Sequence, residues 1–276
     1  MKKYSFEDFQ KEFPNEDSCL EYIVRIRFPN QELRRIKGRK AYTTQDRRHI
    51  YPLKGTIFER SSTSLMKWFY AIYLFSQSKN GVAAKELERQ LGVTYKTAWR
   101  MAKAIRGLMK EGDIKLSGVV EADEAYIGGR RPRRSGSYFK DKAPIVGVVQ
   151  RGGQLRGKVI SRRDEYEIIP FLQKYIRKGS ILVTDDAAIY NVVRGYKKQT
   201  INHSQKQYVL GDVYTNTIEN FWGQLKRSLH GTHHSVSKKH LQSYVDEFVY
   251  RYNRKNVPQP DQLRALLGRI DPPKQL

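Results

Sequence analysis

Four short apolar runs separated by glycines lie between Gly112 and Tyr190: "GVVEADEAYIGG", "APIVGVVQRGG", "LRGKVISRR" and "SILVTDDAAIY". Such runs are typical of β-strands. The segment "EYEIIPFLQKYIRKG", between the third and fourth runs, has a helical pattern. Three hairpin-like strands, a helix and a further strand predict a mixed sheet covered by helices, and hence an α/β domain.

Two amphipathic helices are predicted after these strands, in "NTIENFWGQLKRSLHG" and "SKKHLQSYVDEFVYRYNRKN". Their apolar residues recur at helical spacing, which indicates core packing. The stripes consist of Ile218, Phe221, Trp222, Leu225 and Leu229 in the first helix, and of Leu241, Tyr244, Val245, Phe248, Val249 and Tyr252 in the second.

The chain before Gly112 is predicted to be mainly helical. We expect a helix over residues 16–27, bounded by Pro14 and Pro29, and an apolar helix in "SLMKWFYAIYLFSQS". In residues 80–112, two short helices that meet at Gly92 follow the helix-turn-helix pattern. The second helix would present to DNA Tyr95, Lys96, Thr97 and Arg100. The alternative is an ordinary helical hairpin with solvated lysines.

Charge favours nucleic acid as the partner. The chain of 276 residues has 52 Lys and Arg against 28 Asp and Glu, a net charge of +24. Such a field attracts a polyanion, although an anionic membrane or ribosomal RNA would also satisfy it. No apolar run approaches the length of a spanning helix, so we expect a cytoplasmic, nucleoid-associated protein without membrane contact.

Further DNA contacts are predicted from basic side chains outside the helical pair. The segment "GGRRPRRSGSYFKDK" could lie along phosphates, or it could be a solvated turn. The residues in question are Arg130, Arg131, Arg133 and Arg134, together with Arg227 beside the second apolar stripe.

Carboxylates interrupt segments that otherwise look buried. Asp123 lies within the first β-run, and Asp185 follows "ILV" at the end of the fourth. A buried carboxylate is costly unless a cation or hydrogen bonds compensate it. Glu219 opens an amphipathic helix, and Lys226, seven residues later, shares its face at roughly 10 Å along the axis. Oxygen donors from two strands and a helix suit Mg²⁺ or Mn²⁺, and two such ions can act on a phosphodiester.

Each acidic residue also has a structural interpretation. Asp123 could pair with an arginine, and Asp185 could begin a turn after its strand. "NTIE" reads as a capping box with Asn216 at the N-cap and Glu219 at the third helical position.

The chain resembles the ISXO-like insertion-sequence transposases over residues 55–255. The resemblance is carried by "VEADEAYIGGR", "VTDDAAIY", "TNTIENFWGQLKR" and "YVDEFVYRYNR", with "GTIF" and "LGVTYKTAWRM" upstream. It implies an RNase H-like catalytic domain of the DDE type, with Asp123 and Asp185 as the first two metal ligands. Either Glu219 or Asn216 would be the third, since the family triad is sometimes written with Asn; we prefer Glu219.

One departure from the family lies near the N-terminus. Relatives carry a zinc ribbon with two CxxC pairs, whereas residues 30–58 contain no cysteine. We therefore expect no zinc, and a buried thiol at the lone Cys19. For a histidine group we favour phosphate or backbone contacts over metal; it comprises His230, His233, His234 and His240.

These observations predict an RNase H-like mixed sheet flanked by helices, preceded by a helix-turn-helix region. The expected parts are an N-terminal helix and cysteine-free basic segment (1–60), a helix-turn-helix region (61–112), a catalytic domain (113–255) and a C-terminal tail (256–276). The expected function is metal-dependent 3′ strand cleavage at transposon ends and strand transfer, by an oligomer on double-stranded DNA. The alternatives are an inactive DNA-binding derivative and a nuclease that cuts without joining.

Overall fold

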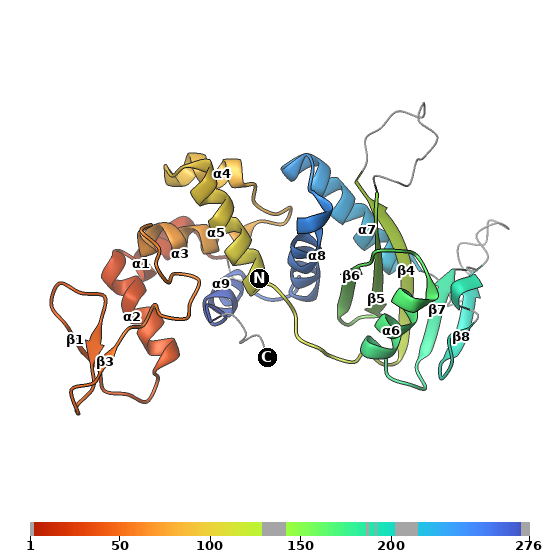
Figure 1. The fold of residues 1–276 in the computed structure, drawn as a ribbon, viewed down its shortest axis with the longest axis horizontal. Coiled ribbons are helices and arrows are strands. Elements are labelled where there is room, and N and C mark those ends of the chain that lie inside the picture. Colours follow the sequence, from red (N-terminus) through yellow and green to blue (C-terminus); the bar gives the residue numbers. More distant parts are fainter. Residues whose placement is uncertain (1–2, 129–141, 186–187, 191, 202–214, 272–276) are drawn as a thin grey trace. The chain divides into compact units, whose positions relative to one another are not determined.

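The computed structural model of the chain describes residues 3–128, 142–185, 188–190, 192–201 and 215–271 (Figure 1). The chain divides into two compact units. The first runs to Met109 and includes the residues from Asn256 onward, and the second is Lys110–Lys255. Within the described ranges, no helix is long and apolar enough to cross a membrane.

The first unit is mainly helical. Its helices are α1 (Phe6–Glu12), α2 (Glu16–Arg27), α3 (Leu65–Gln77), α4 (Ala84–Leu91), α5 (Tyr95–Leu108) and α9 (Gln259–Leu267). Helix α2 has the predicted bounds, since Asn15 and Ser18 form a capping box at its start. Cys19 is fully buried, as expected, and burial raises the pKa of its thiol to about 12.

The predicted pair of short helices is present in α4 and α5. Helix α4 ends at Gly92, which adopts the left-handed conformation at φ 57° that glycine tolerates best. Thr94 then caps α5, and its hydroxyl accepts a hydrogen bond from the Thr97 N–H. Leu87 of α4 and Met101 of α5 are fully buried and lie on the inner faces of the two helices.

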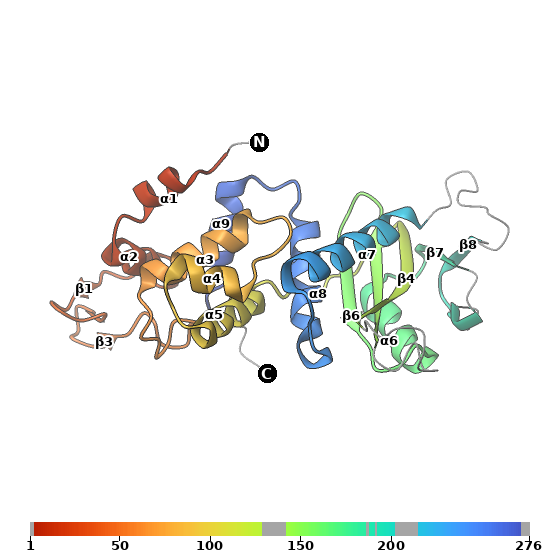
Figure 2. The ribbon, with the colours of Figure 1, turned by 90° about the horizontal axis from the view of Figure 1, so that it is seen from above.

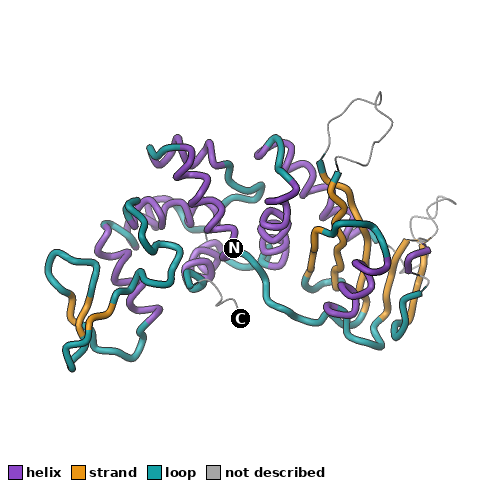
Figure 3. The backbone as a smooth tube through the Cα atoms, in the orientation of Figure 1, coloured by secondary structure: helices purple, strands orange, loops and turns teal. Residues whose placement is uncertain are grey.

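The cysteine-free segment contains a small antiparallel sheet. Its strands, of two residues each, are β1 (Arg34–Arg35), β2 (Tyr42–Thr43) and β3 (His49–Ile50), and they lie side by side in that order. Figure 3 colours the strands of both sheets orange.

The segment that we expected to be a C-terminal tail contains a packed helix. In α9, the side chains of Leu263, Leu266 and Leu267 are buried, and the helix packs against α3. Burial of these leucines supplies the hydrophobic free energy that fixes the segment to the first unit.

The second unit is built on a five-stranded mixed sheet, which confirms the predicted α/β class. Its strands are β4 (Val119–Ile127), β5 (Ala143–Gln150), β6 (Leu155–Val159), β7 (Ile181–Asp185) and β8 (Lys197–Ile201). The order is β6-β5-β4-β7-β8; the first three are antiparallel, and β4, β7 and β8 are parallel. Strand β8 was not predicted, because "KKQTI" lacks a run of apolar residues.

Helices cover both faces of this sheet (Figure 2). They are α6 (Glu165–Tyr175), α7 (Asn216–Ser228) and α8 (Lys238–Asn253); a short helix, η1 (Ala188–Tyr190), follows β7, and a π-helical turn, η3 (Leu229–His233), follows α7. One apolar core joins α7 and α8 to the sheet, and a second joins α6 to the opposite face. β4 contributes Ala125 and Ile127 to the first core and Val120 and Ala122 to the second.

Glycines allow α7 and α8 to approach the sheet closely. A Cβ at Gly147 of β5 would lie 2.6 Å from Cζ2 of Trp222, and one at Gly157 of β6 would lie 2.9 Å from Cγ1 of Val245. Larger residues at these positions would therefore push the helices away from the strands.

Candidate active site

Asp123 lies in the central strand of the sheet, on the face covered by α7. Side chains alternate along a strand, so Asp123 shares this face with Glu121, Ala125 and Ile127. Burial raises the pKa of Asp123 to about 7; the backbone N–H of Glu124 opposes this shift, and the carboxylates of Glu124, Asp185 and Glu219 add to it. The predicted carboxylates therefore lie within electrostatic reach of one another.

No arginine among the described residues forms an ion pair with Asp123. The arginines near the sheet pair with its neighbours: Arg151 Nε lies 3.0 Å from Glu121 Oε1, and Arg163 Nη2 lies 2.9 Å from Glu124 Oε2.

Asp185 ends β7, the parallel neighbour of β4, and its side chain is 32% exposed. Arg163 Nη2 lies 3.9 Å from Asp185 Oδ2, so the guanidinium that pairs with Glu124 also approaches Asp185. The sheet thus brings Asp123 and Asp185 together from adjacent strands.

The alternative interpretation of Glu219, as part of a capping box with Asn216, is wrong. Thr215, not Asn216, is the N-cap, and its side chain does not cap the helix. Its hydroxyl instead donates a 2.6 Å hydrogen bond to Glu219 Oε1. The N–H groups of Thr217 and Ile218, in the first turn of α7, donate instead to the Glu121 carboxylate of β4. Asn216 is the first helical residue and is exposed, as are Glu219 and Lys226.

Two site residues were missed by the sequence analysis. Glu121 is fully buried and accepts hydrogen bonds from the backbone N–H groups of Thr217 and Ile218, at 3.0 and 3.1 Å. Glu124, with a side chain only 2% exposed, accepts a 2.5 Å hydrogen bond from the Tyr190 hydroxyl. Both flank Asp123 in "VEADEAY", and a buried strand with three carboxylates was the available signal.

The donor set fits a hard divalent cation in its chemistry. Carboxylate oxygens are the ligands that Mg²⁺ and Mn²⁺ prefer, and a cation would oppose both the burial and the carboxylate repulsion that raise the pKa of Asp123. In the part of the chain that the structure describes, however, no three His, Cys, Asp or Glu side chains are grouped as a metal site. Asp186, next to Asp185, lies outside the described residues.

The predicted DNA-contacting side chains of α5 lie at its exposed start. Tyr95 is 47% exposed, and Nζ of Lys85 lies 5.2 Å from the centroid of its ring. Lys96 and Arg100 are exposed. Thr97 is half-buried. Arg227 is exposed on α7, whereas the predicted contacts Arg130, Arg131, Arg133 and Arg134 lie outside the described residues.

The histidine group after α7 is not assembled as a metal site in the described chain. The ring of His233 packs edge-on against Tyr244, with centroids 4.8 Å apart. The contact of this half-buried ring with a tyrosine points to packing for this member of the group.

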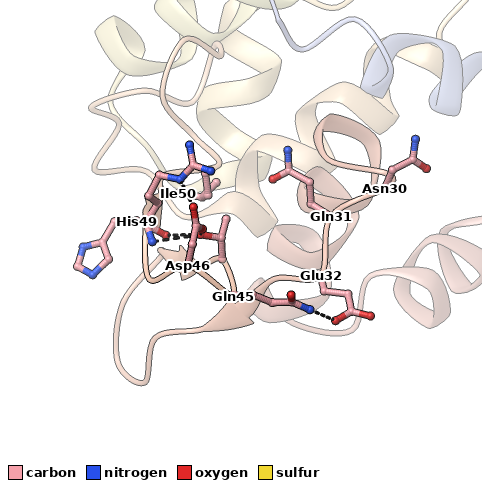
Figure 4. Close-up of a pocket in the computed structure, with 9 residues that line it drawn as sticks. Asn30, Gln31, Glu32, Gln45, Asp46, His49 and Ile50 are labelled. Atoms are coloured by element: carbon pink, nitrogen blue, oxygen red, sulfur yellow. Dashed lines mark hydrogen bonds and ion pairs between the residues drawn. The ribbon is translucent and has the colours of Figure 1, made fainter.

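A polar pocket lies beside the small sheet of the first unit (Figure 4). Its carboxylates are engaged locally: Gln45 donates to Glu32 at 2.6 Å, and Arg48 pairs with Asp46 at 2.5 Å. The ring of His49 points away from both acids in Figure 4. These contacts give the pocket no grouped ligands for a cation.

Comparison with known proteins assigns the chain to a family. Residues 115–253 match the model of the ISXO2-like transposase domain. This match spans half of the chain and contains the five-stranded sheet of the second unit, so the chain belongs to the ISXO2-like transposase family, as the sequence motifs had indicated.

A curated relative comes from a transposable element. The chain is 28% identical over 232 residues to an uncharacterized protein in transposable element ISH50 of Halobacterium salinarum, an alignment that covers 77% of this chain and 78% of the relative.

Two solved structures are similar to the chain at low TM-scores. A simian T-cell lymphotropic virus intasome in complex with PP2A regulatory subunit B56 gamma matches with a TM-score of 0.29 and 11% identity, covering 72% of this chain and 66% of the other. A pre-cleavage Mos1 transpososome matches with a TM-score of 0.19 and 10% identity, covering 72% and 77%. Neither similarity bears on the fold.

Proposed function

We propose that the chain cleaves the 3′ strand at the ends of an insertion sequence and joins it to target DNA. The observation that carries this proposal is the half-buried carboxyl group of Asp123 on the central strand. Asp185 ends the adjacent parallel strand, and Glu219 is on the helix that covers the face of Asp123. Burial, together with the nearby carboxylates, raises the pKa of Asp123. Perturbed carboxylates of this kind are characteristic of functional sites. Membership of the transposase family supplies the substrate class.

Asp123, Asp185 and Glu219 would hold Mg²⁺ or Mn²⁺, with Asn216 as an auxiliary or substitute for Glu219. When bound, a pair of such ions supplies Lewis-acid stabilisation to the attacking and leaving oxygens of a phosphodiester. The order of the sheet strands, with the carboxylates on adjacent parallel strands, supports the RNase H-like assignment of residues 113–255.

The protein groups themselves perform positioning and charge recognition. Asp123 is on the central strand, which is paired on both sides, and the helix of Glu219 packs over the same face of the sheet. Lys226, two turns along the exposed side of α7, would hold the phosphate next to the scissile bond. Such positioning lowers the entropic part of the barrier to an in-line displacement.

Sequence-independent DNA binding would be supplied by basic side chains. In residues 61–112, α4, the Gly92 turn and α5 form the proposed helix-turn-helix, with Tyr95, Lys96, Thr97 and Arg100 toward DNA. Arg227 and the arginines of residues 130–134 would add phosphate contacts. Because transposition joins two ends, we propose a homo-oligomer on double-stranded DNA.

The test uses the full chain, Mg²⁺ or Mn²⁺, and labelled duplexes carrying the DNA that flanks its gene. Asp185→Asn should abolish nicking and joining but retain binding. The control is Asp113→Asn, since Asp113 is an exposed carboxylate of the same unit that pairs with Lys174. Equal cleavage by the Asp185 variant and the native chain would reject the site.

The same assay separates the two alternatives. Salt-dependent binding by the native chain with neither nicks nor joined strands would indicate a DNA-binding protein derived from a transposase. Nicks without joined strands would indicate a nuclease.

A further inference from the structure

Glu121 is a buried charge with an unusual set of partners. Its side chain is fully buried on β4, two residues before Asp123. Oε2 accepts the Thr217 and Ile218 N–H groups at 3.0 and 3.1 Å, and Oε1 accepts the Thr217 hydroxyl at 2.9 Å and Arg151 Nε at 3.0 Å. Each oxygen therefore has two donors, so this carboxylate is engaged by protein groups rather than directed to an ion.

These bonds join two elements that are far apart in sequence. Thr217 and Ile218 are in the first turn of α7, where N–H groups lack partners within the helix. The helix does not satisfy them with its own N-cap side chain. Glu121 does so from the sheet, and its negative charge also suits the positive end of the helix dipole. The start of α7 is thereby fixed to β4.

A second contact fixes α7 one turn farther along. Trp222 and Ile218 pack directly on Gly147, the residue of β5 that pairs with Asp123 in the sheet register. The helix is held at both points, and between them lies Glu219. The position of Glu219 relative to Asp123 thus depends on the contact between Glu121 and the helix start.

We propose that Glu121 is a positioning residue of the active site, which holds the helix of Asn216 and Glu219 in register with the strand of Asp123. This role rests on the proposed function, because it concerns the geometry of that carboxylate group. Arg151, with a side chain 19% exposed, compensates the charge of Glu121.

The matched control is another buried Glu–Arg pair in the same unit. Glu247 of α8 is fully buried and its Oε1 lies 2.6 Å from Arg251 Nη2, within one helix. Glu121→Gln and Glu247→Gln each replace a buried carboxylate that pairs with an arginine by a neutral amide of nearly the same size. Only the first change affects the attachment of α7.

The experiment compares the native full chain with both variants in two measurements. Electron paramagnetic resonance detects free Mn²⁺ during a titration and so gives the Mn²⁺ affinity. Amide hydrogen exchange reports the protection of the backbone N–H groups of α7. Glu121→Gln should weaken Mn²⁺ binding about 10- to 100-fold, as is usual when a residue that orients ligands is changed. Exchange at Thr217 and Ile218 should accelerate. Glu247→Gln should lower thermal stability but leave the Mn²⁺ affinity and exchange at α7 unchanged.

The outcomes separate the inference from the proposed function. Native Mn²⁺ affinity and slow exchange in Glu121→Gln would overturn the positioning role. If the native chain itself bound no Mn²⁺, the proposed metal site would fail, and faster exchange at Thr217 and Ile218 would still establish that Glu121 holds α7. If Glu121→Gln fails to fold, Thr217→Val removes only the hydroxyl bond to Oε1; it should weaken Mn²⁺ binding in the same direction, and native affinity would overturn the role.

Discussion

The hydroxyl of Tyr190 donates a 2.5 Å hydrogen bond to the Glu124 carboxylate. Tyr190 belongs to η1, which follows β7, and Glu124 belongs to β4. Tyr190 and the Glu124 side chain are both 2% exposed. Burial is the main cause that raises the pKa of Tyr190 well above its usual value, and the negative charge of Glu124 adds to it. The bond connects the segment after Asp185 to the residue after Asp123.

Removal of this hydroxyl should destabilise the chain. Tyr190→Phe leaves a buried carboxylate oxygen without this donor, a loss of about 1–3 kcal/mol in the free energy of unfolding. Tyr175→Phe is the control, because Tyr175 donates to Asp113, whose side chain is 66% exposed. Urea unfolding should show a lower free energy of unfolding for Tyr190→Phe but not for Tyr175→Phe. Equal urea midpoints for the two variants would contradict the importance of the buried bond.

The raised pKa of Asp123 predicts a pH dependence of stability. The unfolded chain releases this proton near the ordinary pKa of 3.8, whereas the folded chain holds it up to about 7. Unfolding therefore releases a proton in this window, and the native chain loses stability as the pH rises from about 4 to about 7, by up to about 1.4 kcal/mol per pKa unit.

Asp123→Asn should remove this part of the pH dependence. Thermal unfolding midpoints are compared at pH 5 and pH 8 without divalent metal. Between pH 5 and pH 8, the midpoint of the native chain should fall more than that of the variant. A difference between the two proteins that is independent of pH would show that Asp123 does not titrate in this range.

Close packing at Gly147 predicts a steric effect on α7. Gly147→Ala would place a methyl group 2.6 Å from Trp222 Cζ2 and should cost about 1–3 kcal/mol through overpacking. Gly231→Ala is the control, because a Cβ there would meet nothing within 4 Å. Thermal unfolding should show a lower midpoint for the first variant only, and an unchanged midpoint would mean that α7 can shift freely.

The proposed DNA face of α5 predicts a change in salt dependence. Lys96→Ala and Arg100→Ala should each weaken binding to any duplex and reduce the slope of log K against log salt by about one, as for a phosphate contact. Arg89→Ala on α4 is the control, since Arg89 pairs with Glu86. Fluorescence anisotropy at several salt concentrations measures the slope; equal slopes for all variants would place the DNA elsewhere.

Local patterns in the sequence were enough to predict most elements. The bounds of α2 follow from its capping residues and flanking prolines, and the turn at Gly92 follows from the left-handed conformation that glycine allows. The apolar runs predicted β4 to β7, and the motifs identified the transposase family. These features depend on neighbouring residues, which a sequence displays directly.

Contacts between distant segments were decided only by the tertiary structure. The sequence suggested that Asn216 caps α7 with Glu219, whereas Glu121, about 96 positions before Thr217, satisfies the first turn. Strand β8 was missed because it forms by pairing with β7 at the edge of the sheet. Helix α9 was missed because it is held by packing against α3, which is distant in the sequence. Spacing along the chain identified the carboxylates, but the sheet and the helix packed on it determine which of them face one another, because hydrogen bonds and burial are satisfied in space and not along the sequence.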